Sequence, residues 1–244
     1  TPPPSTASHT VFMYDTRAPG CSGTIQLPIT QPTVDTSAQI NWGDGSAVES
    51  LKKARQEHTY AQPGVYMVSY KGELREMIGT QVDNASKACI TGIKQWAQDT
   101  DLYKIMRLGG DNFTYIAEPP HSVTIMDGLF YGATSFNQSI DHWDVSNVTS
   151  MNTMFMNAYA FNQPLNSWDV SNVTDMKGMF FKAQAFNQPL NSWDTAKVTN
   201  MEEMFAIASD FNQNLSGWNV GAVTDWANFA SSKLTTANTP PKFR

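Results

Sequence analysis

The side chains best suited to bind a ligand form a row, with one member in each of four similar sequence segments. Carboxylates about 5 Å apart in a row repel one another unless a positive charge lies between them. One interpretation is therefore a shallow groove that binds Ca²⁺ or another ligand. The alternative is a solvated row in which each Asp accepts a hydrogen bond from a neighbouring backbone or Ser group. The candidate ligand-binding residues are Asp144, Ser146, Asp169, Ser171, Asp194 and Asn219.

Catalytic candidates are lacking in this sequence. The histidines, His9, His58, His121 and His142, have no Cys, Asp or Ser partner at a spacing typical of a catalytic site. Asp44 stands in an Asp-Gly turn, which explains this residue better than metal binding does. No phosphate-binding glycine loop or zinc signature is present. We therefore expect a protein that is not an enzyme and that has no cofactor, apart from the Ca²⁺ considered for the Asp row.

The segments that carry the row repeat with a fixed period of 25 residues. A fixed period in the range of about 20 to 50 residues indicates units that stack on one another to bury an apolar face. The Asn-Gln pair that follows each repeat phenylalanine predicts a structural ladder of stacked amides. The residues that mark the register are Phe136, Phe161, Phe186 and Phe211, with Trp143, Trp168, Trp193 and Trp218 below them.

Within one repeat the spacing predicts a short helix followed by a short strand. The helix face would consist of Met151, Met154, Phe155, Ala158 and Phe161. A threonine precedes each predicted helix at the position of an N-cap, and these residues are Thr149, Thr174, Thr199 and Thr224. The inward residues of the strand and its turn would be Leu165, Trp168, Val170 and Val173.

The period also divides the chain. Residues 10–72 show no 25-residue repeat, and alternating apolar and polar residues there predict a small all-β module. The predicted domains are a Pro/Ser/Thr-rich linker at 1–9, the β module at 10–72, a connector at 73–87, the repeats at 88–236 and a tail at 237–244. Within the repeats, degenerate coils occupy 88–136, regular coils 137–211 and a C-terminal coil 212–236.

Composition excludes several classes of function. The chain has 244 residues, a formal net charge of -6 and 16% charged residues, which argues against sequence-independent nucleic-acid binding. No apolar run approaches the roughly 20 residues of a membrane-spanning helix, so we expect no membrane insertion. The Pro-rich ends are typical of linkers in a longer polypeptide. Cys21 and Cys89 carry no metal-ligand spacing, so they form either one disulfide or two inert buried thiols.

Two parts of the sequence resemble known families. Trp42 to Ser46, W-G-D-G-S, followed by H-T-Y-x-x-P-G-x-Y-x-V from His58, resembles the PKD-like domain over about 60 residues. Residues 88–236 resemble the BspA-like, bacterial surface-protein type of leucine-rich repeat, whose F-N-Q-P-L-N-x-W-D-V-S-N-V-T-x-M-x-x-M-F hallmark runs from Phe161 to Phe180. The implied fold class is multidomain: an N-terminal all-β immunoglobulin-like sandwich, then an α/β leucine-rich-repeat solenoid of 25-residue coils.

The resemblance also implies a setting and a role. BspA-like proteins occur mainly on the surfaces of bacteria, mycoplasmas and some protists, where they are implicated in adhesion. We therefore expect an extracellular or cell-surface fragment of a larger protein, monomeric, that recognises a protein or glycan of a host or neighbouring cell. The alternative is a structural spacer or targeting module of a larger secreted enzyme. An extracellular setting favours the disulfide between Cys21 and Cys89.

Overall fold

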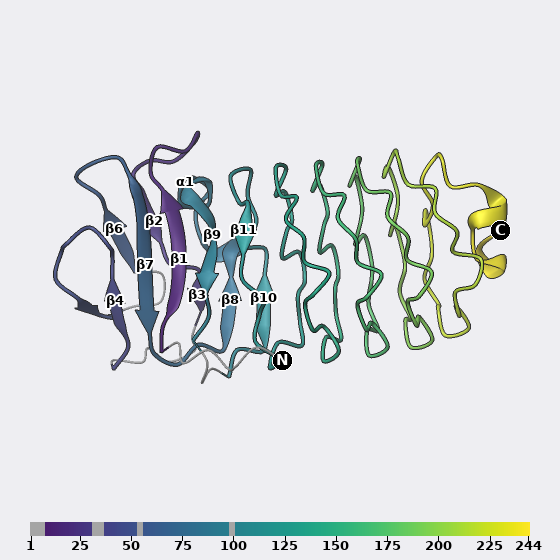
Figure 1. Ribbon diagram of the computed structural model, residues 1–244, viewed down its shortest axis with the longest axis horizontal. Coiled ribbons are helices and arrows are strands. Elements are labelled where there is room, and N and C mark those ends of the chain that lie inside the picture. Colours follow the sequence, from purple (N-terminus) through teal and green to yellow (C-terminus); the bar gives the residue numbers. More distant parts are fainter. Residues whose placement is uncertain (1–7, 31–36, 53–55, 98–100) are drawn as a thin grey trace.

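The computed structural model describes residues 8–30, 37–52, 56–97 and 101–244. It shows an elongated molecule with β-strands at one end and a stack of similar coils that continues to the other end (Figure 1). Most of the predicted linker at 1–9 lies outside the described residues.

Three sheets build the N-terminal part. The strand order of the largest sheet is β11-β9-β1-β7-β4-β5, that of the second is β10-β8-β3, and β2 pairs with β6. The strands are β1 (Thr10–Asp15), β2 (Thr24–Gln26), β3 (Ile29–Thr30), β4 (Gln39–Asn41), β5 (Glu49–Ser50), β6 (Glu57–Thr59), β7 (Val65–Lys71), β8 (Glu76–Ile78), β9 (Ile90–Gln95), β10 (Lys104–Met106) and β11 (Tyr115–Ile116). The helical segments are η1 (Gly79–Gln81), α1 (Asn84–Cys89), η2 (Thr236–Asn238) and η3 (Pro241–Phe243).

Alternation along β1 explains how the large sheet forms. Phe12 and Tyr14 are buried while the residues between them are partly exposed, as expected for a strand with one face on the core. β1 pairs antiparallel with β7, with Phe12 opposite Val68, and also with β9 on its other edge. β9 and β11 come from residues 88–136, the predicted start of the repeats. The sheet therefore continues from the N-terminal strands into the first coils.

The predicted fold class was wrong. The sheets lie in the N-terminal part and do not form a solenoid, and residues 101–235 contain no helix at all. Successive coils are joined instead by one isolated parallel bridge each, at Ser150, Asp175, Asn200 and Asp225. An α/β leucine-rich-repeat solenoid, with a helix in every coil, is incompatible with this arrangement.

Consecutive turns replace the predicted helix. The N–H of Met154 donates to Met151 O, three residues back, at 3.2 Å, whereas Met151 N donates to Asp175 O of the next coil at 3.0 Å. Thr153 has a positive φ of 53° and Asn157 a positive φ of 60°, which an α-helix does not allow. In a helix these backbone N–H groups would form hydrogen bonds within the same segment. Here they donate to carbonyl groups of the next coil. The predicted helix-face residues are still buried, because turns bonded three residues back give a similar spacing.

The repeat threonines do not cap helices, so that prediction was also wrong. Thr174 Oγ1 donates to the carbonyl of Thr149 at 3.2 Å, and Thr174 N donates to the same oxygen at 2.9 Å. Thr199 bonds Thr174 in the same way. The threonines therefore form a ladder along the stack.

Aromatic ladders fill the core of the stack. The rings of Phe155 and Phe180 stack with centroids 5.4 Å apart, and those of Trp143 and Trp168 lie 6.4 Å apart. Trp168 Nε1 donates to Ile140 O at 3.0 Å, so the indole is both packed and hydrogen-bonded. Because the rings stack in register, the coils share one orientation. The Asp row therefore lies on the same exterior side of each coil.

Candidate functional site

The predicted Asp row lies on the exterior of the stack, and every member uses one oxygen to hold its own turn. The Oδ1 atoms of Asp144, Asp169 and Asp194 each accept the N–H two residues later at 3.0 Å. Asn219 Oδ1 accepts Gly221 N at 3.2 Å in the same way. These are Asx turns. The geometry is that of the alternative interpretation, in which each Asp bonds a neighbouring backbone group.

The predicted serines contribute to this local bonding. Ser146 Oγ donates to Asp144 Oδ1 at 2.6 Å, and hydrogen bonds from Ser146 lower the pKa of Asp144. Hydrogen bonds from Ser171 likewise lower the pKa of Asp169. These hydrogen bonds therefore favour the ionised forms of Asp144 and Asp169.

A histidine and a lysine flank the acidic row. His121 Nδ1 lies 3.2 Å from Asp144 Oδ2, and Lys197 Nζ donates to Asn172 Oδ1 at 2.7 Å. Repulsion from Asp144 raises the pKa of Asp169, whereas the positive charge of Lys197 lowers it. These opposing effects are small beside the Ser171 hydrogen bonds. The carboxylates are close enough to interact, and basic side chains partly balance their charge.

The row does not form a metal cage. Among the described residues, no group of three or more His, Cys, Asp or Glu side chains is placed to hold a metal ion. Ca²⁺ takes six to eight oxygen ligands, which carboxylates one coil apart do not supply by themselves. The row instead presents separate charges to the solvent.

The structure joins His58 and Asp44, which sequence reasoning left apart. His58 Nε2 lies 2.7 Å from Asp44 Oδ2, and the ring of His58 stacks on Trp42 with centroids 4.8 Å apart. Hydrogen bonds from Ser46 and then from His58 hold the pKa of Asp44 well below its usual range. The only sequence signal was that both residues belong to the PKD-like motifs. The pair braces β6 against the Gly43–Gly45 turn.

The two cysteines form a disulfide. Cys21 and Cys89 have an S–S distance of 1.97 Å and a Cα–Cα distance of 4.9 Å. The bond ties the loop before β2 to the C-terminal end of α1.

A second exterior row was missed by the sequence analysis. Tyr131, Met156 and Phe181 occupy equivalent positions in successive coils and are each partly exposed. The guanidinium of Arg107 lies 4.6 Å from the Tyr131 ring centroid, and Lys182 Nζ lies 5.4 Å from that of Phe181. The 25-residue spacing of these three residues was visible in the sequence. The prediction of a helix, however, did not indicate that this position faces outward.

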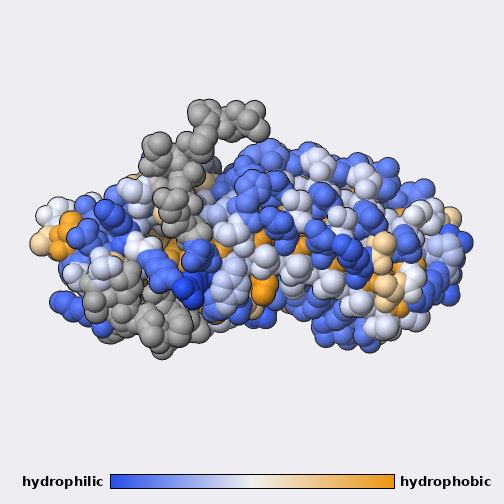
Figure 2. All heavy atoms as spheres, turned by 90° about the horizontal axis from the view of Figure 1, so that it is seen from below, coloured by the Kyte–Doolittle hydropathy of each residue, from blue (hydrophilic) through white to orange (hydrophobic). Residues whose placement is uncertain are grey.

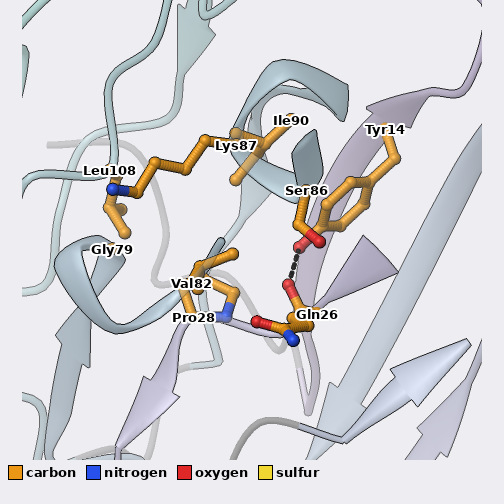
Figure 3. A pocket seen from close by; sticks show the side chains of 9 residues that line it. All are labelled: Tyr14, Gln26, Pro28, Gly79, Val82, Ser86, Lys87, Ile90 and Leu108. Atoms are coloured by element: carbon orange, nitrogen blue, oxygen red, sulfur yellow. Dashed lines mark hydrogen bonds between the residues drawn. The ribbon is translucent and has the colours of Figure 1, made fainter. Parts of the chain in front are cut away.

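Two hollows lie beside α1. A cavity of about 10 Å³, the size of one water molecule, lies beneath the aliphatic part of Lys87, with Tyr14 OH donating to Gln26 O nearby (Figure 3). An open groove of about 300 Å³ lies between α1 and the first coils. The face of the stack that Figure 2 shows is mostly hydrophilic, with small apolar areas. Neither hollow encloses a drug-sized ligand with catalytic groups.

No helix among the described residues is long and apolar enough to cross a membrane. Residues 124–240 match a family model described as "Mycoplasma protein of unknown function, DUF285". This match covers most of the repeat stack and leaves the N-terminal sheets outside it. No curated protein and no solved structure matches the chain.

Proposed function

We propose that the protein is a non-catalytic recognition module of a cell surface or secreted protein, which binds a protein or glycan of another cell through the exterior of its repeat stack. The observation that supports this proposal is the repetition of each exterior position once per coil. Side chains at such positions are held in one orientation by the coil beneath them. A ligand that spans several coils can therefore contact several identical groups without ordering them first.

Two further observations agree with an extracellular role. The Cys21–Cys89 disulfide is typical of proteins that fold in an oxidising compartment. The resemblance of residues 88–236 to BspA-like repeats, and of the Trp42 and His58 motifs to PKD-like domains, points to surface adhesion. The proposed partner is a host or neighbouring-cell protein or glycan, bound by a monomeric fragment of a larger surface protein.

The Asp row is the first surface to test. Its charge favours a basic partner, and steering by such a row depends on salt. Asn219 shows that an amide holds the same turn as Asp, so Asp169→Asn with Asp194→Asn removes two charges while keeping both Asx hydrogen bonds. This double substitution separates charge from structure.

The experiment begins by applying the wild-type protein to arrays of purified extracellular-matrix proteins and of glycans. For any ligand found, the double Asn variant should bind at least about tenfold more weakly, a loss of about 1.4 kcal/mol. The matched control is Lys177→Gln with Glu203→Gln on the opposite side of the coil, which should bind like wild type. Absence of any ligand on the arrays contradicts recognition. Loss of binding in the control alone would move the site away from the Asp row.

A further inference from the structure

Two basic side chains lie close together where α1 meets the first coils. Figure 3 shows the Lys87 side chain extended from α1 towards Leu108, the chain neighbour of Arg107. Burial lowers the pKa of Lys87, and the positive charge of Arg107 lowers it further, whereas Asp83 opposes this shift. Among the described residues, no carboxylate lies within ion-pair distance of either cation. Because like charges repel, an anion bound beside both would be favoured.

The neighbouring coil holds the arginine in place. The guanidinium of Arg107 lies 4.6 Å from the centroid of the Tyr131 ring. A Cβ atom at Gly128 would lie 2.8 Å from Arg107 Cγ, so this glycine lets the arginine side chain cross its coil to reach the ring. A contact between a cation and a ring uses none of the guanidinium N–H donors. Arg107 is therefore oriented and still able to bind a carboxylate.

The open groove of about 300 Å³ beside these cations also contains hydrogen-bond acceptors. Its lining includes Lys87, Tyr131, Asp111 and Asn112. Asn112 Nδ2 donates to Ala88 O at 2.9 Å, and no described residue donates to its Oδ1. Asp111 Oδ1 accepts one hydroxyl at 3.1 Å, and its Oδ2 has no donor in the described part of the chain. Asp111 is not among the groups that shift the pKa of Lys87, so the acceptors lie apart from the cations.

Such a groove fits a ligand that carries both an anion and hydroxyl donors. A carboxylate or phosphate alone would use only the cations, and Asp111 would repel a ligand with several negative charges. A sugar acid offers one carboxylate to Lys87 and Arg107. Its hydroxyl groups would donate to Asp111 and Asn112, and its apolar C–H face would pack on Tyr131. We propose that this groove binds one acidic monosaccharide unit of the uronic acid class.

An NMR titration of the full chain with methyl β-D-glucuronide tests the proposal. Methyl β-D-glucoside lacks the carboxylate and sodium acetate lacks the sugar, so each compound supplies one half of the ligand. The glucuronide should bind at least about tenfold more tightly than either. It should shift the amide signals of Lys87, Gly110 and Asp111. Acetate that binds as tightly as the glucuronide would indicate an anion site only, and tighter binding of a short oligoaspartate peptide would indicate a peptide site. Either result overturns the proposal, as does equal binding of the neutral glucoside.

Matched variants locate the site. Lys87→Gln and Arg107→Gln should each weaken glucuronide binding by at least about tenfold, whereas Lys94→Gln, at an exposed lysine of β9, should leave it unchanged. Equal effects of all three variants contradict the assigned groove. Lys87→Gln removes one of two like charges, so it should not lower the melting temperature of the free protein. A marked fall would assign Lys87 a structural role and overturn the proposal. The Asp169→Asn, Asp194→Asn variant should bind the glucuronide normally, so this proposal and the proposed recognition through the Asp row fail independently.

Discussion

The N-terminal sheets and the repeat stack are both built from backbone bonds between strand-like segments, but they connect very different distances along the chain. β1 pairs with β7 and β9, far downstream in sequence, and the disulfide spans a separation of 68 residues. In the stack, side-chain and backbone bonds join residues about 25 positions apart, coil after coil. Stability in the stack is therefore close to a sum of neighbour contacts, whereas the sheets form only when distant segments meet.

The largest expected effect tests whether the stack melts apart from the sheets. Trp168→Ala removes a ring that is 3% exposed, together with its hydrogen bond to Ile140 O, and should destabilise the stack by about 3 to 5 kcal/mol. Calorimetry should show a repeat transition at lower temperature beside a nearly unchanged sheet transition. Asp169→Asn is the control and should change little. A single transition that moves as a whole would contradict the separation of the two regions.

The disulfide should act on the sheets alone. Opening a loop of 68 residues costs about 4 kcal/mol in the chain-entropy model. Cys21→Ser with Cys89→Ser should therefore lower the melting temperature of the sheet transition and leave the repeat transition in place. Thiol titration of the denatured, unreduced wild type should find no free thiol. Two reactive thiols would remove the basis of this prediction.

Polar ladders should contribute less than the aromatic ones. Asn187 Oδ1 accepts Asn212 N at 3.1 Å and Gln213 Nε2 at 2.9 Å. Asn187→Ala leaves both donors without this acceptor and should cost about 1 to 2 kcal/mol. Gln184→Ala, at an exposed position of the same coil, should stay within about 0.5 kcal/mol in urea unfolding. If Asn187→Ala lowers the free energy of unfolding no more than its control does, the polar ladder does not contribute to stability.

The smallest expected effects are those of pH on stability. Lowering the pH should weaken the contribution of Asp44 in the N-terminal part and remove the cost of Asp127 in the stack. Hydrogen bonds from Ser46 lower the pKa of Asp44, so its contribution is present above the unfolded pKa of about 3.9 and is lost as pH falls below that value. Asp44→Asn should cost about 1 kcal/mol at pH 7 and progressively less in acid. Chemical unfolding at several pH values measures both quantities.

Asp127, in the stack, should show the reverse dependence. Burial raises the pKa of Asp127, and hydrogen bonds from Ser150 and Asn152 oppose this rise only in part. Its ionised form therefore costs stability at neutral pH, and the cost disappears as pH falls through the raised pKa towards about 3.9. Asp127→Asn keeps an Oδ1 acceptor for both donors and should stabilise by about 0.5 kcal/mol at pH 7 and by nothing near pH 4. A constant effect across this range would contradict the assigned pKa direction.

The sequence predicted which residues are buried better than it predicted how the backbone buries them. Met151, Met154, Phe155 and Ala158 are buried as the period requires, but turns bonded three residues back bury a similar set to that of a helix. The distinguishing signal was the positive-φ position, which is Gly128 and Gly178 in two coils but Thr153 and Glu203 in others. At non-glycine residues this backbone conformation leaves little trace in the sequence.

For the candidate sites, too, the sequence predicted some features and not others. The outward placement of Asp144, Asp169 and Asp194 follows from their position after a buried Trp, whereas their binding role stays a prediction. Contacts such as His58 with Asp44 need the fold of the whole N-terminal part.

The disulfide also determines how the molecule would behave under mechanical load. When the chain is pulled from its two ends, the covalent link between Cys21 and Cys89 carries the tension, and the 68-residue segment that it closes cannot extend. At about 3.5 Å per extended residue, roughly 240 Å of chain is withheld from stretching. Each coil, by contrast, can peel away in a step of about 90 Å. The molecule would lengthen through its repeats and through β1, which precedes Cys21, while the segment between the two cysteines stays closed.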